Sequence, residues 1–136
     1  RVCLNPRRYS CYNAFMNTEA IVSAISTLRA GAAGGEYDLH AMIARALTDA
    51  GISFSHEYRL APRRRIDFLV GSVGVEVKKG RPGRRELVSQ LERYLESDEL
   101  AEVVVVARRA VALPRTICGK RVTVVSLNRL WGVSLP

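Results

Sequence analysis

The sequence predicts a single α/β domain in which helices flank a mixed central β-sheet. Its 136 residues are enough for one domain of the commonest size. Apolar residues repeat at helical spacing in some segments and cluster or alternate, as in strands, in others. A tight turn joins two expected strands and a helix separates two later ones, so the sheet should contain both antiparallel and parallel pairs.

Two helices are expected before the first strand. Residues 1–17 show no clear period and are interpreted as an irregular arm. Apolar residues repeat at helical spacing over 18–28. The glycine-rich segment 31–35 should end this helix, and a second helix is predicted over 36–50.

The remaining chain supplies the strands and one more helix, over 84–97, in which leucines recur at helical spacing. The predicted strands are 52–60, 65–70, 73–78, 102–107 and 121–127. The core, residues 36–136, therefore has the order α-β-β-β-α-β with a further strand, and residues 1–35 add an N-terminal arm and helix. A short closing turn is expected at 128–131.

The most informative segment is the hairpin formed by residues 65–78. A glycine-serine pair fits a two-residue turn, and folding about it places Asp67 opposite Glu76. Because side chains alternate along a strand, Asp67, Glu76 and Lys78 should share one face. The opposite, apolar face is expected to carry Ile66, Phe68, Val70, Val73, Val75 and Val77.

Two carboxylates in this position repel each other. Directly opposite residues have Cβ atoms about 5 Å apart, and at an effective dielectric constant of about 20 the repulsion is roughly 3 kcal/mol. A cation between Asp67 and Glu76 would remove this cost, and hard oxygen ligands suit Mg²⁺ or Mn²⁺ rather than zinc. The alternative is a solvated sheet face that bears a Glu76–Lys78 pair.

The hairpin segment, in this order of elements, resembles a known family. The residues that carry the resemblance are Ile66-Asp67 followed by Val75-Glu76-Val77-Lys78. In this order of elements, they resemble the PD-(D/E)xK nuclease superfamily, which has the restriction-endonuclease-like fold. The resemblance covers roughly residues 36–127 and includes features of the RecB-like and Holliday-junction-resolvase-like branches. In one departure, isoleucine stands where many members have proline.

The resemblance implies a set of site residues. Asp67 and Glu76 would bind Mg²⁺, with the main-chain carbonyl of Val77 as a further ligand, and Lys78 would orient the attacking water. Glu36 opens the helix before the first strand, where many members carry a metal-site glutamate. The alternative for Glu36 is an acidic residue favoured by the helix dipole.

Gln90 and Tyr94 lie four residues apart on one side of the helix predicted over 84–97. They resemble the Q-x-x-x-Y element of RecB-like nucleases, which lies near the metal site and DNA. The alternative is a core tyrosine beside a boundary glutamine.

The charge of the chain favours a polyanionic partner. The formal net charge is +8 and the pI is near 10.0, which points first to nucleic acid. Cations at a helix N-terminus oppose the helix dipole, and a bound phosphate would relieve that conflict. The expected phosphate contacts are Arg63, Arg64, Arg65, Lys79, Arg81, Arg84 and Arg85. For each of them the alternative is a solvated surface charge.

Together these patterns predict a Mg²⁺-dependent deoxyribonuclease, with Mn²⁺ as a second possible ion. Cleavage should be weakly sequence-specific or directed by DNA structure, because little chain lies outside the core. A homodimer would provide the two sites that cleavage of both strands requires, and a partner protein would supply targeting. The alternatives are a Holliday-junction resolvase, a non-catalytic DNA-binding module on the same fold, and an RNA-binding or ribosome-associated protein.

The remaining patterns are less specific. Three cysteines without a CxxC pair are interpreted as free thiols in a reducing compartment, the cytoplasm. No apolar run approaches the roughly 20 residues that span a bilayer. His40 and His56 lack partners at zinc-site spacing, and His40 is interpreted as a surface or boundary residue of its helix.

Overall fold

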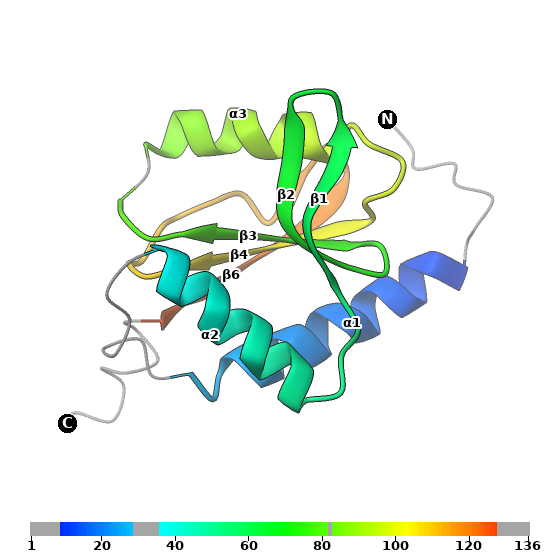
Figure 1. Ribbon diagram of the computed structural model, residues 1–136. Coiled ribbons are helices and arrows are strands. Elements are labelled where there is room, and N and C mark those ends of the chain that lie inside the picture. Colours follow the sequence, from blue (N-terminus) through cyan, green and yellow to red (C-terminus); the bar gives the residue numbers. More distant parts are fainter. Residues whose placement is uncertain (1–8, 29–35, 82, 128–136) are drawn as a thin grey trace.

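A six-stranded sheet forms the centre of the molecule, with strand order β1-β2-β3-β4-β6-β5. The computed structural model describes residues 9–28, 36–81 and 83–127, except for the side chains of 9–12 and 36–38 (Figure 1). The strands are β1 (Ser55–Ala61), β2 (Arg64–Val70), β3 (Val73–Lys78), β4 (Glu102–Ala107), β5 (Thr116–Ile117) and β6 (Lys120–Ser126). The helices of the described residues are α1 (Tyr9–Ile25), α2 (Glu36–Asp49) and α3 (Arg84–Leu95).

The sheet is mixed, as the sequence predicts. Strands β1, β2 and β3 pair antiparallel in a meander. Helix α3 then carries the chain back, so that β4 pairs parallel with β3, and β6 pairs parallel with β4. The short strand β5 pairs antiparallel with β6 at the far edge. From α2 onward the elements follow the order helix, three strands, helix, strand.

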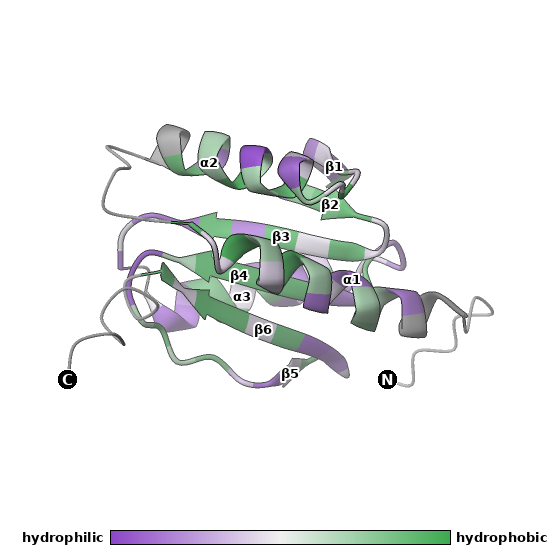
Figure 2. Cartoon of the chain, turned by 90° about the horizontal axis from the view of Figure 1, so that it is seen from below, coloured by the Kyte–Doolittle hydropathy of each residue, from purple (hydrophilic) through white to green (hydrophobic). Residues whose placement is uncertain are grey.

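Two hydrophobic cores lie on opposite faces of the sheet. Helices α1 and α2 cover one face and α3 covers the other (Figure 1). Strand β4 is buried along its whole length: Val104 and Val106 belong to the first core, and Val103 and Val105 to the second. Hydrophobic residues follow this strand through the centre of the sheet (Figure 2). The prediction of a strand buried on both faces is therefore confirmed.

The first helix is longer than predicted. Helix α1 begins at Tyr9, so the interpretation of residues 9–17 as an irregular arm is wrong. Its buried stripe includes Ala14 and Thr18 ahead of Ile21 and Ile25. A small residue and a polar one lie at the first two of these positions, so the sequence shows no apolar period there.

A buried polar contact fixes α1 to the sheet. Thr18, at 1% exposure, donates its hydroxyl to Oε1 of Glu102 over 2.9 Å. The same oxygen accepts a hydrogen bond of 2.7 Å from Nε of Arg121 on β6. Helix α1 is thus an integral part of the core rather than an appendage.

The hairpin register agrees with the sequence, but one side chain lies on the other face. Phe68 pairs with Val75, and the two pairs nearer the turn are also those predicted. Ile66, however, packs in the core beneath α3, whereas Phe68 packs in the core beneath α1 and α2. The prediction that both residues share one face is wrong.

The reversal lies opposite an irregular residue of the neighbouring strand. His56 pairs with Phe68 and Tyr58 pairs with Ile66, and between them Glu57 has a positive φ of 54°. A left-handed residue breaks the regular alternation of an extended strand. The change of face between Ile66 and Phe68 thus coincides with this irregular residue of β1.

The other boundaries differ by a few residues. Strand β1 begins three residues later than predicted, and α3 ends two residues earlier. The sequence does not predict strand β5, because two residues are too few to show an alternating pattern. The closing turn predicted at 128–131 lies outside the described residues.

Candidate metal centre

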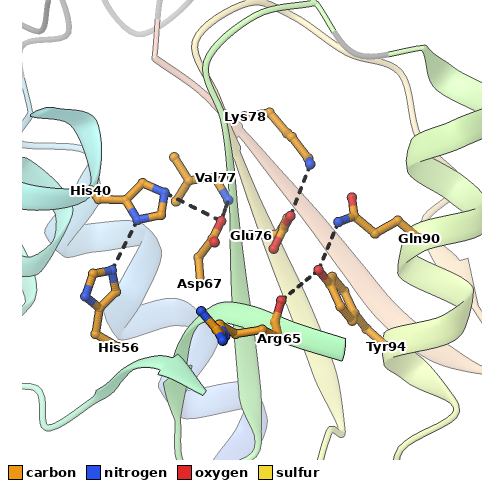
Figure 3. Close-up of polar contacts among 9 residues, drawn as sticks. All are labelled: His40, His56, Arg65, Asp67, Glu76, Val77, Lys78, Gln90 and Tyr94. Carbon is orange, nitrogen blue, oxygen red and sulfur yellow. Dashed lines mark hydrogen bonds and ion pairs between the residues drawn. The ribbon is translucent and has the colours of Figure 1, made fainter. Parts of the chain in front are cut away.

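The candidate site lies where β2 and β3 stop pairing. The ladder extends from Val70–Val73 to Phe68–Val75 and ends one residue before the predicted Asp67–Glu76 pair. In place of the next backbone contact, the main-chain N–H of Val77 donates to Oδ2 of Asp67 over 2.8 Å. The Asp67 side chain is therefore inserted at the point where the two strands separate (Figure 3).

Glu76 is the most unusual residue of this site. It is only 4% exposed, although it carries a carboxyl group. Its Oε2 lies 3.1 Å from Nζ of Lys78, but its buried Oε1 has no hydrogen-bond partner among the described residues. Buried polar atoms without a partner are rare and costly, because they have lost the hydrogen bonds of water.

The electrostatics of Glu76 reflect the same arrangement. Burial raises the pKa of the Glu76 carboxyl to about 7, and the neighbouring Asp67 carboxylate adds to the rise. The Lys78 ammonium acts in the opposite direction but does not cancel these effects. The site therefore lacks positive charge when both acids are ionised.

These residues fit a divalent cation. The carboxylate of Asp67 is held at one oxygen, Oδ2, by the main chain of Val77, and Glu76 presents an oxygen without a partner in the described part of the chain. An ion between them would offset the Asp67 charge, which adds to the effect of burial on the pKa of Glu76. It would also coordinate the oxygen that has no partner among the described residues. Within the described residues, however, no three His, Cys, Asp or Glu side chains are grouped as a metal site.

Glu36 is the predicted additional ligand. It is the first residue of α2, but its side chain lies outside the described part of the structure. Whether Glu36 and the Val77 carbonyl complete the coordination shell therefore remains a prediction.

Gln90 and Tyr94 are brought to the site by α3. The Gln90 amide donates to the Tyr94 hydroxyl over 2.9 Å, and that hydroxyl donates to the main-chain oxygen of Arg65, also over 2.9 Å. Burial and the Glu76 carboxylate raise the pKa of Tyr94, so it remains a neutral donor. The pair fixes α3 to β2 two residues before Asp67 (Figure 3).

Two histidines for which the sequence predicts no role in the site also lie close to it. The ring nitrogens His40 Nδ1 and His56 Nε2 lie 3.2 Å apart. On its other side His40 places Nε2 3.7 Å from Oδ2 of Asp67 (Figure 3). They come from α2 and β1, and no short motif joins them, so only the tertiary fold reveals the cluster.

The predicted phosphate contacts fall at the two ends of α3. Lys79, Arg81, Arg84 and Arg85 are exposed around its first turn, and Arg84 also donates to the main-chain oxygen of Ala112. The arginines 63–65 lie in and after the β1–β2 turn. A helix of 12 residues is roughly 18 Å long, so the two groups are well separated.

The arginines after the β1–β2 turn have protein partners. Arg64 donates to the main-chain oxygen of Arg93 and forms a 3.1 Å contact with Glu96 at the end of α3. Nη1 of Arg65 lies 3.8 Å from Oε2 of Glu57. Arg64 is thus held against the end of α3, whereas Arg63 and Arg65 are exposed, as are the cations near the start of α3.

No protein-family profile, curated protein or solved structure matches this chain. No helix in the described residues has the length and apolar character that a membrane span requires.

Proposed function

We propose that this protein is a divalent-metal-dependent nuclease that hydrolyses DNA phosphodiester bonds and has a restriction-endonuclease-like fold of the PD-(D/E)xK type. The observation that carries the proposal is the buried Glu76 carboxylate beside Asp67, with an oxygen that no described residue contacts by a hydrogen bond. A purely structural glutamate would gain stability from a complete set of hydrogen bonds.

The side chains of the site have distinct tasks in this proposal. Asp67 and Glu76 would hold Mg²⁺ or Mn²⁺, with Val77 and Glu36 as further ligands. Such an ion supplies a more acidic water and stabilises negative charge on the phosphate. Lys78 contacts Glu76 at 3.1 Å and would orient the nucleophilic water through its remaining ammonium protons.

The supporting residues keep this geometry rigid. Tyr94 and Gln90 hold β2 in place through the Arg65 carbonyl, and Val77 N–H holds Asp67. Rigid placement of ligands is what allows a site to favour the transition state. The cations near the start of α3 would contact phosphates, which positions DNA without reading its sequence.

A second candidate function is a DNA-binding module without catalysis. It is favoured by one observation: the described residues contain no group of three potential metal ligands. In that case Asp67 and Glu76 would serve the fold alone.

Digestion of a panel of DNA forms tests the proposal. Linear duplex, single strands and a four-way junction are incubated with Mg²⁺ or Mn²⁺ and with a chelator. The unchanged protein should cleave at least one form only with metal. Glu76→Gln and Lys78→Ala should each lower the rate by roughly 100-fold or more, while DNA binding persists.

The matched control is Glu92→Gln, which removes an exposed carboxylate of α3 and should leave the rate unchanged. DNA binding without metal-dependent cleavage of any form would overturn the nuclease proposal and favour the module. Cleavage of the junction alone would identify a resolvase.

A further inference from the structure

The imidazoles of His40 and His56 form a connected pair outside the carboxylate pair. His40 belongs to α2 and His56 to β1, yet their ring nitrogens Nδ1 and Nε2 are 3.2 Å apart. At this distance the N–H of one ring donates a hydrogen bond to the lone pair of the other ring nitrogen. The side chain of His40 is only 15% exposed, so the protein rather than water sets its partners.

An aromatic cluster holds these rings in place. His56 stacks on Phe68, with ring centroids 4.6 Å apart and an angle of 21° between the planes. His40 lies against the same phenyl ring at 5.6 Å. Phe68 is fully buried and directly follows Asp67 in the chain. Both histidine rings thus pack on the residue of β2 that adjoins Asp67.

The Asp67 carboxylate selects the tautomer of His40. Oδ2 of Asp67 is 3.7 Å from Nε2 of His40, and a lone pair pointing at a carboxylate oxygen would be repelled. A proton on Nε2 is attracted instead. Nδ1 of His40 would then carry the lone pair and need a donor, and Nε2 of His56, 3.2 Å away, can donate when it carries the proton.

We propose that His56 and His40 are positioning residues, which act as a hydrogen-bond relay that orients the Asp67 carboxylate for a divalent cation. His56 Nε2–H donates to His40 Nδ1, and His40 Nε2–H points at Asp67 Oδ2. The 3.7 Å separation is longer than a hydrogen bond, and such contacts commonly shorten when a site is loaded. Oδ2 is then held from two directions, which leaves Oδ1 for the ion.

The relay rests on the proposed function, because it acts on a carboxylate that would bind the metal. Hydrogen bonds to ligand carboxylates tune metal affinity, and removal of such an outer partner typically costs roughly 10- to 100-fold. The relay therefore adds residues from α2 and β1 to a site otherwise built by β2, β3 and α3.

Metal binding to the protein alone provides the first test. Mn²⁺ is titrated into the protein without DNA, and the dissociation constant is measured by electron paramagnetic resonance. His56→Phe keeps a ring for stacking on Phe68 but has no N–H donor. It should weaken Mn²⁺ binding roughly 10-fold or more, whereas His56→Gln, which retains a donor, should recover part of the loss.

The ¹⁵N chemical shifts of the histidine side chains provide a second test that needs no variant. The relay requires His40 in the unchanged protein to carry its proton on Nε2. In His56→Phe the preference of His40 for this tautomer should weaken. A proton on Nδ1 of His40, or an unchanged Mn²⁺ dissociation constant in a folded His56→Phe protein, would overturn the relay.

The two proposals can fail separately. If the unchanged protein binds Mn²⁺ and Glu76→Gln does not, the carboxylate site stands, whatever the His56 variants show. If the unchanged protein binds no Mn²⁺, the proposed function fails and the relay with it, even if the tautomer is as stated.

Discussion

Tyr94 donates its hydroxyl hydrogen to the main-chain oxygen of Arg65, 2.9 Å away, and so joins α3 to the strand that carries Asp67. This bond spans two layers of the fold. It makes the position of the carboxylate depend on a helix that contributes no ligand of its own.

Tyr94→Phe should therefore affect both stability and the site. The hydroxyl accepts one partly buried hydrogen bond from Gln90 and donates another to Arg65, so its loss should lower the free energy of unfolding by about 1–3 kcal/mol, measured by urea denaturation. The rate of DNA cleavage should fall further than DNA binding does. Tyr58→Phe is the control, because the Tyr58 hydroxyl bonds to the exposed Glu99, and its loss should change neither quantity appreciably.

The ionisation of Glu76 should make stability depend on pH. Burial raises the pKa of Glu76 from an ordinary 4.5 to about 7 in the folded protein, so the folded state holds this proton more tightly than the unfolded state. As pH rises from about 4.5 to 7, the metal-free protein should lose of the order of 3 kcal/mol of stability from this group. Above that window the contribution should stay constant.

Denaturant titrations at a series of pH values would measure this effect. Glu76→Gln should remove the slope and make the metal-free protein more stable than the unchanged protein at pH 8. Divalent metal should stabilise only the unchanged protein, and less so below pH 7, where Glu76 is protonated. Equal slopes in both proteins would contradict the raised pKa.

The packing of Ile66 under α3 leads to a prediction about Gly74. A methyl group at this glycine would meet the end of the Ile66 side chain, and also Leu100 at 3.2 Å. Gly74→Ala should thus destabilise the protein by about 1–3 kcal/mol. Adding Ile66→Val, which shortens the obstructing side chain, should restore part of that loss in the double variant. Additive losses would show that the two residues do not compete for space.

The contact between Thr18 and Glu102 tests whether α1 belongs to the core. Thr18→Val keeps the shape of the side chain but removes the donor to a buried carboxylate, and should cost about 1.5–3 kcal/mol. Thr48→Val is the matched control, since the exposed Thr48 hydroxyl bonds only within its own helix. Thermal or urea unfolding distinguishes the two variants, and similar costs would refute a special role for Thr18.

The sequence allows the hairpin to be predicted because its pattern is local. The turn fixes the register, and the valines of β3 alternate regularly, so Glu76 and Lys78 are correctly predicted to lie on the face opposite these valines. Ile66 breaks the pattern where β2 lies opposite the irregular Glu57, a residue of another strand. The pairing of Gln90 with Tyr94 follows from helical spacing. The hydrogen bond from the Tyr94 hydroxyl to the main-chain oxygen of Arg65 cannot be inferred from that spacing.

The histidine pair could not be predicted for the same physical reason. His40 and His56 are 16 residues apart and meet only because α2 packs beside the sheet. The sequence does not reveal the start of α1, because the buried face there begins with Ala14 and Thr18, which form no apolar repeat. Local periodicity thus predicts elements, while contacts between layers require the folded chain.

The left-handed Glu57 has one more consequence, because β1 is an outer strand of the sheet. An uninterrupted outer strand offers main-chain N–H and C=O groups to a neighbouring molecule, which invites aggregation. Here the kink at Glu57 and the register shift between Arg59 and Ala61 break that template. At the opposite border, β5 has only two residues, so it offers a foreign strand very little backbone to pair with.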